Sequence, residues 1–322
     1  MDKRLLFLIM QLHVNSSIQV RYAPNEALTD LIPVTHRVRQ GCVLAPSLFN
    51  LFINDLVQCL GSVDSHAPKL ADIRVPVLLY ADYVVILSQT RLGLLRLLGA
   101  FAHYCNDNNL SINYEKSKVL VFTKARKLYK WIVNKENIEQ VYKFKYLGIH
   151  FQYNLNWKSQ RLYSISIAHK TLNALLRFYY SKGGQYIPMA LQVFQAKIVA
   201  QLFYGVLLWI QEVTSEMERV QSIFLRAIFG VPRCVPYSVL CLESRSLTIS
   251  SKAWELTLIK WIKLCLEYLE PSYFWFLWRN SFPSPWLSYV NNKILQMGLF
   301  PSEILLMGIE KAKDRYTLTT SA

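Results

Sequence analysis

One segment, Val75–Ser88, constrains the fold of this chain more than any other. It reads VPVLLYADYVVILS, two apolar runs around a short polar break, which is typical of paired strands. The expected strands are Arg74–Leu79 and Val84–Leu87, with the carboxylate of Asp82 exposed at the turn. Mg²⁺ prefers such oxygens. Aspartate is also common in turns for purely local reasons, so the hairpin alone does not establish a metal site.

Three further segments give this hairpin its context. They are RQGCVLAPSLFNLFINDL at Arg39–Leu56, LSINYEKSKVLVF at Leu110–Phe122 and YKFKYLGI at Tyr142–Ile149. In this order, the four segments resemble the palm of a reverse transcriptase of the type carried by non-LTR (LINE-like) retrotransposons. The resemblance is firm over Asn15–Phe151 and looser beyond it.

The resemblance implies roles for individual residues. Asp82 would bind the Mg²⁺ or Mn²⁺ that nucleotidyl transfer requires, and Lys116 would act as a general acid near the departing pyrophosphate. The alternative for Lys116 is a solvated lysine in a basic stretch. The residues implied in binding nucleotide or nucleic acid are Arg39, Gln40, Gly41, Tyr80, Tyr83, Asn113, Phe144, Tyr146, Leu147 and Gly148, of which the last four resemble a primer grip.

The chain also departs from the family pattern. Tyr83 stands where the family places a second aspartate, and the segment with the first catalytic aspartate would lie before Met1. We therefore expect an N-terminally truncated, degenerate RNA-directed DNA polymerase (nucleotidyltransferase) domain that is catalytically inactive. The alternatives are an active polymerase fragment, a non-catalytic RNA- or DNA-binding remnant, and an unselected relic of a decayed element.

The hydrophobic pattern predicts an α+β chain: a partial polymerase palm, an antiparallel sheet with helices, in residues 1–155, then an all-helical thumb and C-terminal region in residues 156–322. Helical spacing of apolar residues predicts helices at Leu5–His13, from Pro46 to Leu60, and at Arg91–Asn108, Arg161–Tyr180, Pro188–Leu208, Ser215–Phe229 and Ser250–Leu269. Further strands are expected at Ser17–Tyr22, Leu31–Val38, Ser111–Asn113, Lys118–Phe122 and Val141–Phe151.

Charge indicates the partner. The net charge is +15, and the segment Lys116–Lys170 carries +10 of it, with aromatic residues interleaved. Cations beside aromatic faces suit phosphates and stacked bases, so an RNA template and an RNA–DNA duplex are the expected partners. The alternative is that the aromatics face the core and the cations face water. Neither a membrane nor a small-molecule cofactor is expected.

Cysteine spacing and the N-terminus indicate the compartment. Six scattered cysteines without a CxxC pair predict reduced, buried thiols in an intracellular protein, nuclear or cytoplasmic. The N-terminus lacks a cleavage site for a signal peptide. No apolar run reaches the length of about 20 residues that a membrane span needs.

Overall fold

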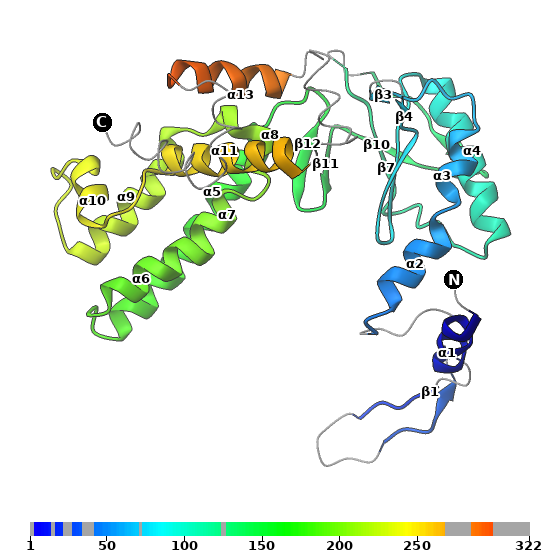
Figure 1. The fold of residues 1–322 in the computed structure, drawn as a ribbon, viewed down its shortest axis with the longest axis horizontal. Helices are drawn as coiled ribbons and strands as arrows, with labels where there is room; N and C mark the ends of the chain where they lie inside the picture. The colour runs from blue at the N-terminus through cyan, green and yellow to red at the C-terminus, as the bar shows by residue number, and fades with distance from the viewer. Residues whose placement is uncertain are drawn as a thin grey trace. The chain divides into compact units, whose positions relative to one another are not determined.

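The computed structural model describes residues 3–13, 17–21, 28–33, 42–70, 73–123, 127–267 and 285–298 (Figure 1). The chain divides into two compact units. The first is Met1–Asn113 with Ile132–Glu136, and the second is Tyr114–Trp131 with Asn137–Ala322. Helices accompany small, mostly antiparallel two-stranded sheets, which confirms the predicted α+β class. The division into domains at residue 155 stays a prediction.

The helices of the first unit follow from the apolar spacing of the sequence. The helices predicted at Leu5–His13 and Arg91–Asn108 are confirmed. The helix predicted from Pro46 to Leu60 is interrupted at Asn54 and Asp55. The bounds are α1 (Lys3–His13), α2 (Ala45–Ile53), α3 (Leu56–Gly61) and α4 (Arg91–Asp107). The interruption leaves Asp55 at the N-cap position of α3, where its carboxylate accepts a hydrogen bond of 2.5 Å from the hydroxyl of Tyr104 on α4.

Three antiparallel hairpins belong to the first unit. They are β1 (Ser17–Ile18) with β2 (Ile32–Pro33), β3 (Lys69–Leu70) with β4 (Ile73–Arg74), and β5 (Val77–Tyr80) with β6 (Tyr83–Ile86). The first pairing confirms the predicted partnership over a shorter length, and residues 22 and 34–38 of those predicted strands lie outside the described residues. The strand predicted from Arg74 begins instead at Val77, because Pro76 has no N–H to donate to a ladder.

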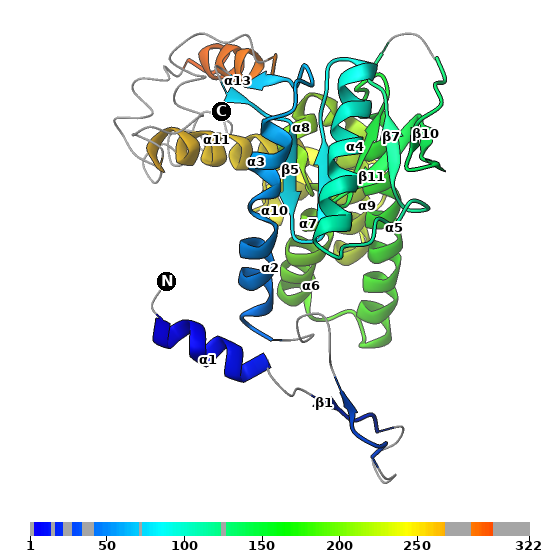
Figure 2. The same ribbon diagram turned by 90° about the vertical axis from the view of Figure 1, so that its right-hand side faces the viewer.

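The core of the first unit lies between α3, α4 and the β5–β6 hairpin. Its buried side chains are Ile53, Leu56, Leu60, Val77, Leu97 and Tyr104. Figure 2 shows α3, β5 and α4 side by side, and residues of α3 contact both α4 and β5. The predicted hairpin is thus backed by helices on one face while its turn reaches solvent.

The second unit opens with strands. β7 (Lys118–Leu120) pairs in parallel with β10 (Glu139–Val141), and β11 (Lys143–Tyr146) pairs antiparallel with β12 (Ile149–Gln152). Between β7 and β10 in sequence, the short strands β8 (Ile132–Val133) and β9 (Glu136–Asn137) pair with each other. Residues Ile132–Glu136 of this pair belong to the first unit. The prediction of a strand at Ser111–Asn113 is wrong. No strand forms at these residues, and β7 pairs with β10 instead. The extended segment predicted at Val141–Phe151 is confirmed and contains a tight turn.

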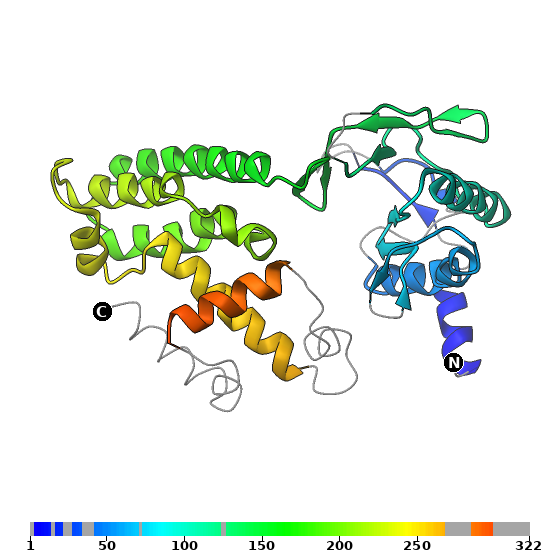
Figure 3. The ribbon, with the colours of Figure 1, turned by 90° about the horizontal axis from the view of Figure 1, so that it is seen from above.

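The rest of the second unit is helical, as predicted. The bounds are α5 (Lys158–Ser181), α6 (Ile187–Val193), the π-helix η1 (Phe194–Val199), α7 (Ala200–Leu202), α8 (Val206–Trp209), the 3₁₀-helix η2 (Ile210–Glu212), α9 (Ser215–Phe229), α10 (Tyr237–Glu243), α11 (Ile249–Glu267) and α13 (Pro285–Gln296). Figure 3 shows these helices, green to orange, packed around one another. In their core the rings of Phe194 and Phe224 stack at 4.2 Å.

The helix predicted at Pro188–Leu208 breaks at Gly205, whose φ is +68°. A Cβ at this position would lie 2.6 Å from the side chain of Ile149 on β12. Glycine is therefore needed at this position for two reasons: it adopts the left-handed conformation without strain, and it lets β12 approach closely. The helices α10 and α13 were not predicted.

Two further expectations concern cysteines and membrane spans. Among the described residues Cys42, Cys59, Cys105, Cys234 and Cys241 are free thiols. Cys234 is exposed, however, against the predicted burial. No single described helix has the length and apolarity of a membrane span, and one bent pair, Ile187–Leu202 with Val206–Glu212, meets the criterion by length and composition only.

Candidate functional site

The turn of the β5–β6 hairpin presents Asp82. Tyr80 pairs with Tyr83, which leaves Ala81 and Asp82 as a two-residue loop. Ala81 has a φ of +50° whereas Asp82 does not have a positive φ, the pattern of a type II′ turn, in which the first loop residue is usually glycine. A left-handed alanine costs about 1–3 kcal/mol and persists only where its surroundings hold it. The hairpin therefore holds Asp82 at a strained, well-defined tip.

Exposure at this tip is high. Asp82 is exposed, and the flanking Tyr80 and Tyr83 are 61% and 54% exposed. The turn thus offers solvent one carboxylate and two aromatic side chains. Such a surface can contact a hydrated cation, or stack on bases.

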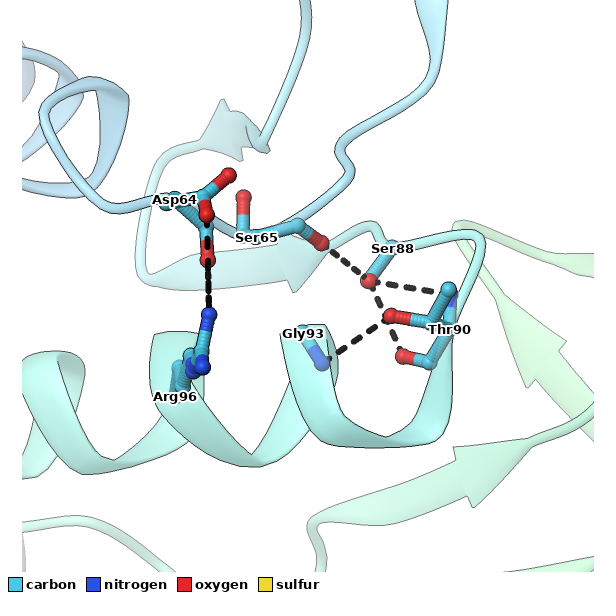
Figure 4. Close-up of polar contacts among 6 residues, drawn as sticks. All are labelled: Asp64, Ser65, Ser88, Thr90, Gly93 and Arg96. Atoms are coloured by element: carbon cyan, nitrogen blue, oxygen red, sulfur yellow. Dashed lines mark hydrogen bonds and ion pairs between the residues drawn. The ribbon is translucent and has the colours of Figure 1, made fainter.

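The base of the hairpin is tied to α4 by a set of polar contacts (Figure 4). The Ser88 hydroxyl donates to the carbonyl oxygen of Ser65 at 2.6 Å. The Thr90 hydroxyl caps α4 by accepting from the N–H of Gly93 at 3.1 Å. Arg96 donates to the Asp64 carbonyl oxygen at 3.1 Å. These contacts fix the end of β6 and the first turn of α4 against the loop that contains Ser65.

Gly93 makes this junction possible. A Cβ at Gly93 would lie 1.9 Å from the Ser65 carbonyl oxygen and 2.5 Å from the Ser88 hydroxyl. Sequence reasoning missed this residue, although a glycine inside a leucine-rich helical pattern often has a packing reason. The anchoring of the Asp82 hairpin to α4 therefore depends on Gly93, a residue without a functional side chain.

The β11–β12 hairpin in the second unit has the other tight turn. Leu147 and Gly148, with φ of +46° and +83°, form its two-residue loop, which is the pattern of a type I′ turn. The hydroxyl of Tyr204 donates to the Leu147 carbonyl oxygen at 2.7 Å. A Cβ at Gly148 would lie 2.8 Å from the ring of Tyr204. Tyr204 therefore covers this turn and ties it to the bend between α7 and α8.

The two faces of this hairpin differ in character. Along β11, Lys143 and Lys145 are exposed while Phe144 and Tyr146 are partly buried. Lys145 donates to the hydroxyl of Tyr163 on α5 at 2.8 Å, and its ammonium lies 4.7 Å from that ring. The alternation places cations on one face and aromatic rings on the other.

The comparisons decide the family. Residues 6–151 match the family model described as reverse transcriptase (RNA-dependent DNA polymerase). This part of the chain is a LINE-like reverse transcriptase domain. The predicted family is thereby confirmed.

The curated relatives of this reverse transcriptase domain come from mobile elements. The RNA-directed DNA polymerase from mobile element jockey of Drosophila melanogaster is 24% identical over 213 residues, 62% of this chain and 22% of the relative. Its counterpart in Drosophila funebris is 23% identical over 209 residues, 61% of this chain and 22% of the relative.

A third relative belongs to another element. The retrovirus-related Pol polyprotein from type-1 retrotransposable element R2 of Popillia japonica is 28% identical over 103 residues, 32% of this chain and 14% of the relative. The chain thus spans less than a quarter of the length of these relatives.

Most of the predicted site residues of the reverse transcriptase domain that the structure describes lie on two hairpins. Tyr80, Asp82 and Tyr83 share the first turn, and Phe144, Tyr146, Leu147 and Gly148 share the second hairpin. Lys116 and Asn113 are both exposed, Lys116 in the second unit and Asn113 at the end of the first. Arg39, Gln40 and Gly41 lie outside the described residues. The roles of all these residues stay predictions.

The Asp82 turn does not fit a two-metal site. Reverse transcriptases use divalent metal ions when active, and two such ions about 4 Å apart need several carboxylate oxygens. Tyr83 offers a neutral hydroxyl where an aspartate would offer a carboxylate. Within the described part of the chain, no group of three or more His, Cys, Asp or Glu side chains is placed to hold a metal.

His150 on β12 makes the second hairpin sensitive to pH. Its ring lies 4.4 Å from that of Tyr163, and both ring nitrogens are buried without a hydrogen-bond partner. Burial first, and then the charges of Lys143 and Lys145, lower the pKa of His150. Below the ordinary histidine pKa of about 6.5, the unfolded chain takes up this proton more readily than the folded chain. The contribution of His150 to stability is therefore greatest above about pH 6.5 and falls as the pH drops.

A His150→Phe variant tests this assignment. Phenylalanine keeps a ring against Tyr163 and does not titrate. We expect the variant to lose less free energy of unfolding than the wild type between about pH 7.5 and pH 5, as measured by urea denaturation at each pH. Equal losses in the two proteins would show that His150 does not contribute to the pH dependence of stability.

Gly148→Ala tests the contact with Tyr204. The alanine would have to adopt a left-handed φ, at a cost of about 1–2 kcal/mol, and would also displace the Tyr204 ring. Gly230→Ala is the matched control, because Gly230 has a φ of +64° and no atom within 4 Å of an added Cβ. We expect Gly148→Ala to cost about 1 kcal/mol more than the control in urea denaturation. Equal costs would contradict the packing role.

Proposed function

We propose that this chain is a reverse transcriptase-like module that binds an RNA template or RNA–DNA duplex and does not transfer nucleotides. One observation carries the proposal: at the exposed turn, Asp82 is followed by Tyr83, where the family places a second aspartate. Nucleotidyl transfer requires two metal ions held by carboxylates, and a tyrosine cannot replace the anionic ligand that Mg²⁺ prefers.

The distribution of charge supports the binding half of the proposal. From Gln140 to Gln211 the sequence contains eight Lys or Arg residues and neither Asp nor Glu. Lys143, Lys158 and Lys170, among these cations, are exposed. A surface with cations and without acids attracts phosphates, because binding releases the counterions condensed on the nucleic acid.

Glycine positions support a chain that folds. At Gly93 and Gly205 an added Cβ would lie 1.9 Å and 2.6 Å from the nearest atom. The fold therefore requires glycine at both positions, and the sequence has glycine at both.

Binding of an RNA–DNA duplex, followed by fluorescence anisotropy, tests the proposal. We expect the double variant Lys143→Gln/Lys170→Gln to lower the affinity about tenfold at moderate salt, because two phosphate contacts are lost. The matched control is Lys260→Gln/Lys263→Gln, which removes the same charge from exposed positions on α11. A wild-type protein that is folded and does not bind would overturn the proposal, as would equal losses in the two double variants.

A further inference from the structure

Exposed apolar side chains gather at the tip where α5 ends and α6 begins. Phe178, Tyr186 and Met189 are 52%, 61% and 45% exposed. With Lys182 they line a cavity of about 130 Å³, whose wall also includes the buried Ala190. Figure 2 shows α5 and α6 running side by side from this tip. Pockets for drug-sized ligands measure about 300–1,000 Å³, so this cavity has room for one ring or one side chain.

The tip is fixed by its own hydrogen bonds. The N–H of Gly183 donates to the Tyr180 carbonyl oxygen at 3.0 Å, and that of Gly184 to the Tyr179 carbonyl oxygen at 3.1 Å. This pair of bonds is the Schellman arrangement that ends a helix. The hydroxyl of Tyr180 donates to the Ala227 carbonyl oxygen on α9 at 2.8 Å. A ligand would therefore meet a preorganised cavity and spend little free energy on ordering it.

Charge around the tip favours an anionic ligand. Lys182 lines the cavity, Arg177 directly precedes Phe178 in the sequence, and both cations are exposed. The tip also lies within Gln140–Gln211, which has no acidic residue. A ligand that carries a flat ring and negative charge fits both the ring-sized cavity and the two cations.

We propose that this tip cavity binds one unpaired base of single-stranded nucleic acid, stacked against Phe178 or Tyr186, with its phosphates near Arg177 and Lys182. Stacking of bases on aromatic side chains combined with cationic contacts to the backbone is how proteins hold single strands. An acidic peptide would satisfy the charge, but the exposed aromatic faces favour a base. The inference rests on the proposed nucleic-acid binding and adds a site for single strands to it.

The test compares an RNA–DNA duplex that carries a single-stranded RNA overhang with the same duplex without an overhang, both bound to the full chain. We expect Phe178→Ala and Tyr186→Ala each to weaken binding of the overhang duplex about five- to a hundredfold and to leave the blunt duplex unchanged. Tyr186→Phe keeps the ring and should keep the affinity. Phe122→Ala removes another exposed aromatic side chain of the second unit (51% exposed) and should have no effect.

The outcomes separate this inference from the proposed function. Normal binding of both duplexes by the two alanine variants, with circular dichroism that shows them folded, overturns the cavity site and leaves the proposed function intact. No binding of either duplex by the wild type overturns the proposed function. A polyglutamate peptide that binds the wild type and loses binding in Phe178→Ala would identify a peptide site instead and overturn the inference.

Discussion

Replacing Gly93 by alanine is expected to lower the free energy of unfolding of the first unit by about 2–3 kcal/mol. In an ordinary helix interior the same change stabilises by about 1 kcal/mol, because alanine loses less backbone entropy. Here the new methyl group would lie 1.9 Å from the Ser65 carbonyl oxygen. That oxygen already accepts the Ser88 hydroxyl, so α4 or the loop must move and the hairpin loses its anchor.

Gly99→Ala is the matched control for this prediction. Gly99 lies on the same helix, and no atom lies within 4 Å of a Cβ added there. We expect it to raise the free energy of unfolding by about 0.5–1 kcal/mol in urea denaturation. If Gly93→Ala were as stabilising as Gly99→Ala, the close contact between α4 and the Ser65 loop would not exist.

The second large effect that we expect is a steep fall of the affinity for an RNA–DNA duplex as the salt concentration rises. If four exposed lysines of the second unit each neutralise one phosphate, the affinity for an RNA–DNA duplex should fall about a hundredfold between 50 mM and 200 mM salt. The Lys143→Gln/Lys170→Gln variant should lower the slope of log affinity against log salt by about two, one for each lost contact. The measurement is a series of anisotropy titrations at increasing salt, and an affinity independent of salt would contradict the electrostatic account.

Local patterns explain what the sequence could predict. The hairpin around Asp82 has two apolar runs around a polar break. The helices α4, α5 and α9 each have apolar residues at helical spacing within one segment. The turn at Leu147 and Gly148 likewise lies within the extended segment predicted at Val141–Phe151. These elements need no knowledge of distant residues, so their predicted bounds lie close to those observed.

Long-range contacts explain what the sequence could not predict. The partner of β7 is β10, more than a dozen residues later, and nothing local excludes Ser111–Asn113 from that place. The break at Gly205 depends on Ile149 of β12, and the need for Gly93 depends on Ser65. Tyr204 likewise lay in a predicted helix, and only the fold shows its hydroxyl on the Leu147 carbonyl oxygen.

Primer extension on an RNA template, with Mg²⁺ or Mn²⁺ and with protein shown to be folded by circular dichroism, measures whether this chain transfers nucleotides. We expect the wild-type chain and its Asp82→Ala variant to bind the primer–template and to add no nucleotide. Extension by the wild type that Asp82→Ala abolishes would overturn the proposed function, because it would mean that other carboxylates complete a metal site around Asp82.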